Sequence, residues 1–205
     1  STIATGMAII THIYDRHPYT IHDDAIAENM HKHFLNSELV YARQSKDRRM
    51  MTTPDDNGQL PLHAALRQNC TLGSIKLLVD GNPHAVRRPD SNGSIPLHIA
   101  SRHHHSTDIV KYLVDLDITN IGAVNNQGDT ALHCACRGAK YDTIALLLQT
   151  RRVVPVSQQN NQKQLAIEVL WESEEVNDRE SREFTECVYR LLRAYPDTLP
   201  DMSFK

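Results

Sequence analysis

The sequence predicts an all-α fold made of helix pairs stacked in an array. One motif, DSNGSIPLHIA at residues 90–100, recurs as DDNGQLPLHAA at residues 55–65 and as NNQGDTALHCA at residues 125–135. The copies are 35 residues apart, as counted between their leucines Leu62, Leu97 and Leu132. A fixed period in the range of roughly 20 to 50 residues is typical of a repeat array rather than of a globule with a single core.

The residue types in the motif predict where each first helix begins. Glycine suits a tight turn with positive φ, which only this residue adopts without strain, and it is present as Gly58, Gly93 and Gly128. Proline fits the first helical turn, where its missing N–H costs nothing. We therefore expect first helices to start at Pro61, Pro96, Ala131 and Ala166. An imidazole in the first turn can satisfy exposed backbone groups, and this position holds His63, His98 and His133.

A second helix follows each motif, because apolar residues recur there at helical spacing. These stripes include Ile75 and Leu78, then Ile109 and Leu113, then Ile144 and Leu147. A degenerate fourth copy of the motif at residues 160–170 has Lys163 in place of glycine and Glu168 in place of histidine. Its second helix is expected from Phe184 to Tyr195, which leaves about nine extra residues between its two helices (44 residues from Leu147 to Leu191, against a period of 35).

The extra residues of the fourth copy are acidic. Between Glu168 and Glu186 there are eight carboxylates against two arginines, a local charge of −6 in a chain whose net charge is −3. We expect residues 172–180 to form an exposed loop or a loosely held helix, because their apolar content is low. A polar outer face suits the last unit of an array. Deletion of this segment is therefore expected to leave the fold intact.

The GxxPLHxA pattern at this period resembles the ankyrin repeat, whose signature contains the same T-P-L-H-x-A core and whose period is about 33 residues. The resemblance covers roughly residues 47–200 and implies a solenoid of stacked helix pairs joined by short β-turn or hairpin loops. It divides the chain into an N-terminal segment, 1–46, and a repeat array, 47–205. The array comprises three clear repeats, a degenerate capping repeat with an acidic insertion, and a short tail.

The segment 1–46 is expected to be an arm followed by capping helices. Asp23 or Asp24 opens a helical pattern in which Ile26, Met30 and Phe34 are spaced by four residues. Ser37 then suits the cap of a second short helix. These two helices form either an N-terminal cap or a further degenerate repeat.

Composition excludes several function classes. The net charge of −3 argues against a nucleic-acid partner, since such binders tend to be strongly basic. No run approaches 18 apolar residues, so we expect no membrane insertion. The four cysteines form no CxxC pair, which favours a reduced, intracellular and cytoplasmic setting. Because the chain begins with Ser1 rather than Met, organelle targeting stays an open alternative.

The candidate chemical groups favour a structural interpretation. His103, His104 and His105 are adjacent and point in different directions, so they predict a solvated helix end better than a metal site. Cys134 and Cys136 replace small apolar residues, which favours core filling over redox or zinc roles. No catalytic spacing of serine, histidine and aspartate, phosphate loop or HExxH motif is present. We expect no enzyme, no metal and no cofactor.

The resemblance implies a module that binds a protein or peptide on the concave face of the array. By resemblance, the variable positions at the loop tips are Asp56, Asn57, Ser91, Asn92, Asn126 and Gln127, with Gln59, Ser94 and Asp129 beside them. Arg67, Arg102 and Arg137 also lie 35 residues apart, at the exposed end of each first helix. A ladder of guanidinium groups would suit an acidic or phosphorylated segment of a partner. The alternative is that these arginines are solvated and favour the helix dipole.

Two other functions are kept open. In the first alternative, the chain is a structural subunit of a larger multiprotein assembly. An exposed apolar patch outside the concave face would favour this subunit role. In the second, it is a regulatory ankyrin segment of a longer protein.

Overall fold

The computed structural model describes four stretches of the chain, residues 49–55, 58–103, 106–150 and 156–194. Within them the secondary structure is helical and contains no β-strand. The chain divides into two compact units, Ser1–Pro83 and His84–Lys205. The N-terminal segment 1–46 and the helices expected in it lie outside the described residues, so the boundary at residue 47 stays a prediction.

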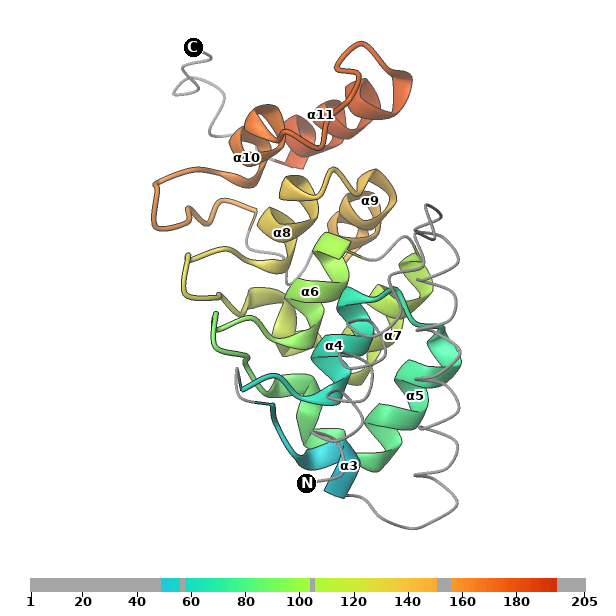
Figure 1. The fold of residues 1–205 in the computed structure, drawn as a ribbon. Helices are drawn as coiled ribbons and strands as arrows, with labels where there is room; N and C mark the ends of the chain where they lie inside the picture. Colours follow the sequence, from blue (N-terminus) through green and yellow to red (C-terminus); the bar gives the residue numbers. More distant parts are fainter. Residues whose placement is uncertain (1–48, 56–57, 104–105, 151–155, 195–205) are drawn as a thin grey trace, which may run out of the picture. The chain divides into compact units, whose positions relative to one another are not determined.

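The first unit contains one complete helix pair. Helix α4 (Pro61–Arg67) packs against α5 (Leu72–Gly81), and a short α3 (Arg49–Thr52) precedes them (Figure 1). Thr71 caps α5, because its Oγ1 accepts a hydrogen bond from the amide of Ser74 at 3.4 Å. Met51 is buried, and its carbonyl accepts a hydrogen bond from Asn82 Nδ2 at 3.3 Å.

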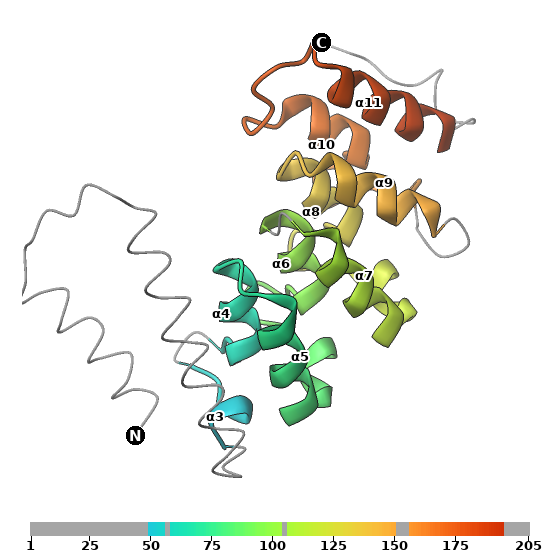
Figure 2. The same cartoon turned by 90° about the vertical axis from the view of Figure 1, so that its right-hand side faces the viewer.

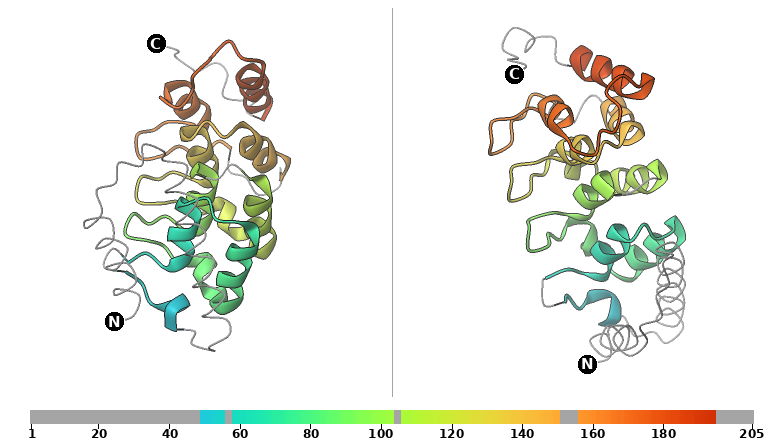
Figure 3. Two further views of the ribbon diagram at one scale, coloured as in Figure 1. Left: turned by 45° about the vertical axis from the view of Figure 1, so that its right-hand side comes forward. Right: turned by 45° about the horizontal axis from the view of Figure 1, so that its top comes forward.

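The second unit stacks three helix pairs in two columns (Figure 2). The first helices are α6 (Pro96–His103), α8 (Ala131–Arg137) and α10 (Ala166–Glu172). The second helices are α7 (Thr107–Leu116), α9 (Tyr141–Gln149) and α11 (Arg182–Ala194). The hairpin loops that precede the first helices extend from their column on the same side (Figure 3). All four first helices, α4 included, begin at the residues expected from the motif.

Two 3-10 helices, which the sequence did not predict, connect a second helix to the next hairpin. They are η1 (Pro83–Arg87) and η2 (Ile118–Gly122). Asp117 caps η2 by accepting from the amide of Thr119 at 3.1 Å, and it pairs with Arg87. The Thr119 hydrogen bonds, followed by Arg87, hold the pKa of Asp117 below its usual value.

The motif leucines occupy the core of the repeats. Leu62, Leu97, Leu132 and Ile167 are each at most 2% exposed. Because each lies on the inner side of a first helix, burial of this position recurs with the sequence period. This agrees with a repeat array in which every unit buries its apolar face against a neighbour.

The acidic segment between α10 and α11 forms a loop with exposed carboxylates, as expected, but two of its residues are buried. Glu174, Glu175, Asp178 and Glu180 are exposed. Ser173 and Val176 are buried, and Ser173 Oγ donates a hydrogen bond to the carbonyl of Arg137 at 2.8 Å. The low apolar content of the segment therefore did not predict the hydrogen bond by which Ser173 is attached to the preceding repeat.

Candidate functional site

Each hairpin of the second unit is closed by the side chain of its first residue. Asp90 Oδ1 accepts hydrogen bonds from the amides of Asn92 and Ser94, both at 2.9 Å. Asn125 and Asn160 bond in the same way to the amides two and four residues later. The turns need positive φ, which Gly93 and Gly128 supply at 70° and 76°, as the motif predicts. Side-chain closure of this kind fixes a turn without help from a sheet.

Neighbouring hairpins are also bonded to one another. The amide of Asn126 donates to the carbonyl of Asn92 at 3.0 Å, and the amide of Asn161 donates to the carbonyl of Gln127 at 3.0 Å. Asn126 Nδ2 adds a hydrogen bond to the carbonyl of Ser91 at 3.2 Å, and Asn161 Nδ2 adds one to the carbonyl of Asn126 at 3.0 Å. The hairpins therefore form a regular ladder. The exposed tip side chains on it are those of Ser91, Asn92, Asn126 and Gln127.

Two of the expected tip residues, Asp56 and Asn57, lie outside the described residues. Their position in the first motif is equivalent to that of Ser91 and Asn92, so their place at a tip stays a prediction.

The motif histidines are structural caps. Nδ1 of His63, His98 and His133 accepts from the backbone amides of Leu60, Ile95 and Thr130 at 2.9, 3.1 and 3.3 Å. Since Nδ1 accepts, the proton of the neutral ring is on Nε2. Nε2 of His98 and of His133 then donates to the carbonyls of Ala123 and Gln164 at 3.0 and 3.1 Å. In the fourth copy Glu168 Oε2 replaces the imidazole and accepts from the amide of Leu165 at 2.7 Å.

Burial sets the charge state of two of these histidines. Desolvation lowers the pKa of both His98 and His133, against smaller raising effects from a backbone carbonyl and from Asp129. Both rings are therefore neutral near pH 7, and each of their nitrogens is used in a backbone hydrogen bond.

The three arginines at the ends of the first helices differ in their partners. In two repeats the arginine is bonded to the residue eight positions earlier, a contact we call the brace. Arg67 Nε donates to Gln59 Oε1 at 3.0 Å, and an Nη of Arg137 donates to Asp129 Oδ2 at 2.8 Å. The fourth copy has the same contact between Gln164 and Glu172, at 2.6 Å.

The second repeat lacks the brace. Ser94 stands where the other copies have glutamine or aspartate, and Arg102 is exposed. Among the described residues, no hydrogen bond or ion pair involves the Arg102 side chain. Arg102 and Arg137 lie in the second unit and Arg67 lies in the first, so the three are described separately.

The expectation that Asp129 is an exposed tip residue is wrong. Its side chain is 1% exposed, and its carboxylate accepts from Arg137 and, at 3.0 Å, from Asn160 Nδ2. Neither Asn160 nor its equivalent Asn125 was predicted as a site residue. The sequence does contain a pattern that could have indicated them. A polar residue opens every motif at the same 35-residue step, as Asp55, Asp90, Asn125 and Asn160.

The cysteines of the second unit are buried and carry no activated thiol. Desolvation raises the pKa of Cys134 and of Cys187 to about 12 and that of Cys136 well above its usual value. Their contribution is therefore core volume. No group of three or more potential ligands within the described residues is arranged to hold a metal ion; His104 and His105 lie outside them.

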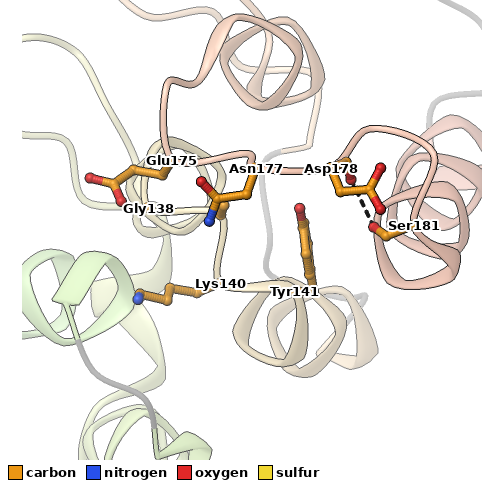
Figure 4. A pocket seen from close by; sticks show the side chains of 8 residues that line it. Gly138, Lys140, Tyr141, Glu175, Asn177, Asp178 and Ser181 are labelled. Atoms are coloured by element: carbon orange, nitrogen blue, oxygen red, sulfur yellow. Dashed lines mark hydrogen bonds between the residues drawn. The ribbon is translucent and has the colours of Figure 1, made fainter.

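A shallow depression of about 360 Å³ lies between the α8–α9 turn and the acidic segment (Figure 4). The Tyr141 ring points toward Asn177 and Asp178, whereas Lys140 extends away from it. Partial burial raises the pKa of Tyr141. The hydroxyl of Ser181, which also lines the depression, donates to the carbonyl of Asp178 at 2.8 Å and accepts from the amide of Phe184. It therefore serves the N-terminus of α11.

Comparison with known families accounts for the repeat. Residues 24–122 and 70–160 match a family model described as ankyrin repeats in three copies. Among curated proteins, none matches the chain. None of the helices in the described part of the chain is long and apolar enough to cross a membrane.

Proposed function

The chain belongs to the ankyrin-repeat family, and from this premise we propose that it is a non-enzymatic module that binds a protein or peptide. Ankyrin repeats are generally protein-interaction modules. We place the partner on the face that combines the hairpin tips with the exposed ends of the first helices. The family supports the general role, and the assignment of this face to this chain is our proposal.

The observation that carries the proposal is the hairpin ladder of the second unit. Its backbone groups are used within and between hairpins, so the tips are held in place without a partner. The side chains of Asn92 and Gln127 are exposed and make no hydrogen bond among the described residues. A rigid backbone with free polar side chains reduces the entropy lost on binding.

The three arginines differ in what they could offer a partner. Arg102 is the one that supports contact with an acidic partner, because Arg67 and Arg137 are each bonded to a side chain of their own repeat. The alternative, that all three are solvated residues at helix ends, is consistent with the exposure of Arg67.

Affinity capture from the native cell, with quantitative mass spectrometry, tests the proposed face. The test variant is Asn92→Glu with Gln127→Glu. The matched control, Gln149→Glu with Thr185→Glu, adds the same charge to the exposed positions of α9 and α11. Proteins captured by the wild type and by the control, but lost from the tip variant, are the expected result. Equal capture by all three chains would contradict the proposed face.

A second candidate function, a structural subunit of a larger assembly, is favoured by exposed apolar side chains. Leu116 and Ile118, two residues apart where α7 meets η2, are 45% and 50% exposed. Tyr189 on α11 is 59% exposed. Large exposed apolar groups favour contact with other subunits. Size-exclusion chromatography of the native complex tests this: a stable assembly that survives the tip variant but dissociates with Leu116→Ser and Ile118→Ser would favour the subunit.

An intracellular, cytoplasmic setting is our proposal for the compartment, and it rests on the buried free cysteines. A regulatory role within a longer protein is compatible with the same binding face.

A further inference from the structure

The third repeat shows how this array holds a carboxylate. The side chain of Asp129 is nearly fully buried between two donors, one from each side. An Nη of Arg137, eight residues later in the same repeat, donates to Oδ2 at 2.8 Å. Nδ2 of Asn160, which opens the following hairpin, donates to Oδ1 at 3.0 Å. The carboxylate therefore receives one charged and one neutral hydrogen bond.

The second repeat has the same two donors without the acceptor. Arg102 stands eight residues after Ser94, and Asn125 stands 31 residues after it, which are the spacings that Arg137 and Asn160 have to Asp129. The hairpins are stacked in the same register in both places, since the amides of Asn126 and Asn161 make equivalent bonds. Ser94 ends at Oγ, so the second repeat supplies no carboxylate of its own to these two donors. Within the described residues, neither the Arg102 guanidinium nor Asn125 Nδ2 has a hydrogen-bond partner.

We propose that this place, between Arg102 and Asn125, binds an aspartate or glutamate side chain of the partner protein. The partner supplies the carboxylate that Asp129 supplies within the chain one repeat later. The inference rests on the proposed function and makes it specific, because it names one contact and its chemistry. A guanidinium and an amide N–H both donate, so they suit an acceptor that carries two oxygens and a negative charge.

A carboxylate fits this place better than a phosphate. The Asp129 contacts show that two donors at this register engage one planar group with two oxygens. A phosphate would present a third oxygen and a second charge, whereas the two donors match the two oxygens and the single charge of a carboxylate. A phosphorylated partner is therefore an outcome of the test and not our proposal.

The test uses random dodecapeptides displayed on phage and selected against the whole 205-residue chain. A selected peptide is then synthesised in three forms: unchanged, with its acidic residue replaced by the amide, and with phosphoserine in its place. Binding is measured by fluorescence anisotropy. Ser94→Gln is the key variant, because a neutral glutamine can engage Arg102 as Gln59 engages Arg67. Arg102→Gln removes the cation, and Arg193→Gln, on the exposed side of α11, is the matched control.

Selected peptides should contain Asp or Glu, and their amide forms should bind at least tenfold more weakly to the wild type. Ser94→Gln and Arg102→Gln should each lower the affinity of the acidic peptide at least tenfold, with thermal stability unchanged, while Arg193→Gln has no effect.

Other outcomes overturn the inference in distinguishable ways. If peptides lose binding to Asn92→Glu with Gln127→Glu but not to Ser94→Gln, the inference fails and the proposed function stands. If the phosphoserine form binds more than tenfold tighter than the acidic form, the carboxylate assignment is wrong. If no selected peptide depends on the tips, on Ser94 or on Arg102, both proposals fall.

Discussion

Gly128 and Lys163 occupy the same place in successive motifs, and the difference between them shows what the glycine contributes. Both have positive φ, at 76° and 60°. A Cβ on Gly128 would lie 2.7 Å from the backbone nitrogen of Asn161, because the next hairpin packs directly on this turn. The hairpin of Lys163 is the last in the described array. Glycine therefore meets two requirements in the third copy, the positive φ and the close approach of the next hairpin, whereas the fourth copy has only the positive φ and accommodates a lysine.

This contrast predicts opposite effects for two substitutions. Gly128→Ala should lower the free energy of unfolding by more than about 1 kcal/mol, because it adds both strain and a backbone clash. Lys163→Gly should raise it by about 0.5–1 kcal/mol, since only the positive φ is relieved. Urea denaturation measures both. A destabilised Lys163→Gly chain would show that the lysine side chain has a role of its own.

The buried histidines predict a loss of stability in mild acid. In the unfolded chain His98 and His133 bind a proton at their usual pKa of about 6.5, whereas in the folded chain their pKa is lowered. The folded state therefore binds fewer protons in this range. Stability should be complete above pH 6.5 and should fall as the pH drops below it.

Thermal melts from about pH 7.5 to about pH 5 test this prediction. The control is His98→Gln with His133→Gln, in which a glutamine keeps an acceptor for the first amide of each helix, as Glu168 does in the fourth copy. The double variant should lose less stability over this range than the wild type. Parallel pH curves for the two chains would show that other groups cause the loss.

Leu97 tests the core of the array. Its side chain is 1% exposed, so Leu97→Ala should lower the free energy of unfolding by about 2–5 kcal/mol. Hydrogen exchange should show lost protection in α8 as well as in α6, because each repeat depends on its neighbours. A variant with the same melting curve as the wild type would contradict the assignment of Leu97 to the core.

At the scale of the element, local chemistry explains why the helix starts were predictable. Proline, threonine and histidine act within one turn of the helix they begin, so their positions in the sequence contain the information. The 3-10 helices were not predictable in this way. η2 is held by Asp117, which pairs with Arg87, and by Asn120 Nδ2, which donates to the carbonyl of Val86 at 3.1 Å. Those partners are 30 and 34 residues away.

Substitutions of the charged and of the buried residues in the acidic segment should have different effects on stability. The joint variant Glu174→Gln, Glu175→Gln and Glu180→Gln should leave the melting temperature nearly unchanged, because these side chains are exposed. Ser173→Ala should lower the free energy of unfolding by about 1 kcal/mol, since it removes the hydrogen bond to the carbonyl of Arg137. If Ser173→Ala is neutral, the buried Val176 and the hydrogen bond from Arg179 to the carbonyl of Trp171 hold the segment instead, and deletion of residues 174–180 becomes the next test.

At the scale of the whole molecule, the fold was more predictable than the candidate site. The repeat period placed the leucines, glycines and helix starts in both units. It also grouped Asp129 with the exposed tips, because a residue beside a turn is usually solvated. Asp129 is buried only because Asn160 and Arg137 approach it from two sides, and one of these contacts crosses to the next repeat. A pattern within one motif does not contain that contact.

The three arginines, which look equivalent in the sequence, are expected to differ in the folded chain. Arg137→Ala should lower the free energy of unfolding by about 1–3 kcal/mol, because it leaves the buried Asp129 carboxylate without its cation. Arg102→Ala should change it by less than about 0.5 kcal/mol, since the side chain is exposed and no hydrogen bond or ion pair among the described residues is lost. Arg67→Ala removes the exposed hydrogen bond to the neutral side chain of Gln59 and should therefore cost less stability than Arg137→Ala.

Chemical denaturation of the three single variants measures this order, and Asp129→Asn with and without Arg137→Ala isolates the ion pair in a double-mutant cycle. Equal stability losses for Arg102→Ala and Arg137→Ala would contradict the brace. If the order holds, substitution of all three arginines mixes a loss of stability with a loss of binding. The single variant Arg102→Ala then separates the two, because among the described residues the Arg102 side chain makes no hydrogen bond or ion pair.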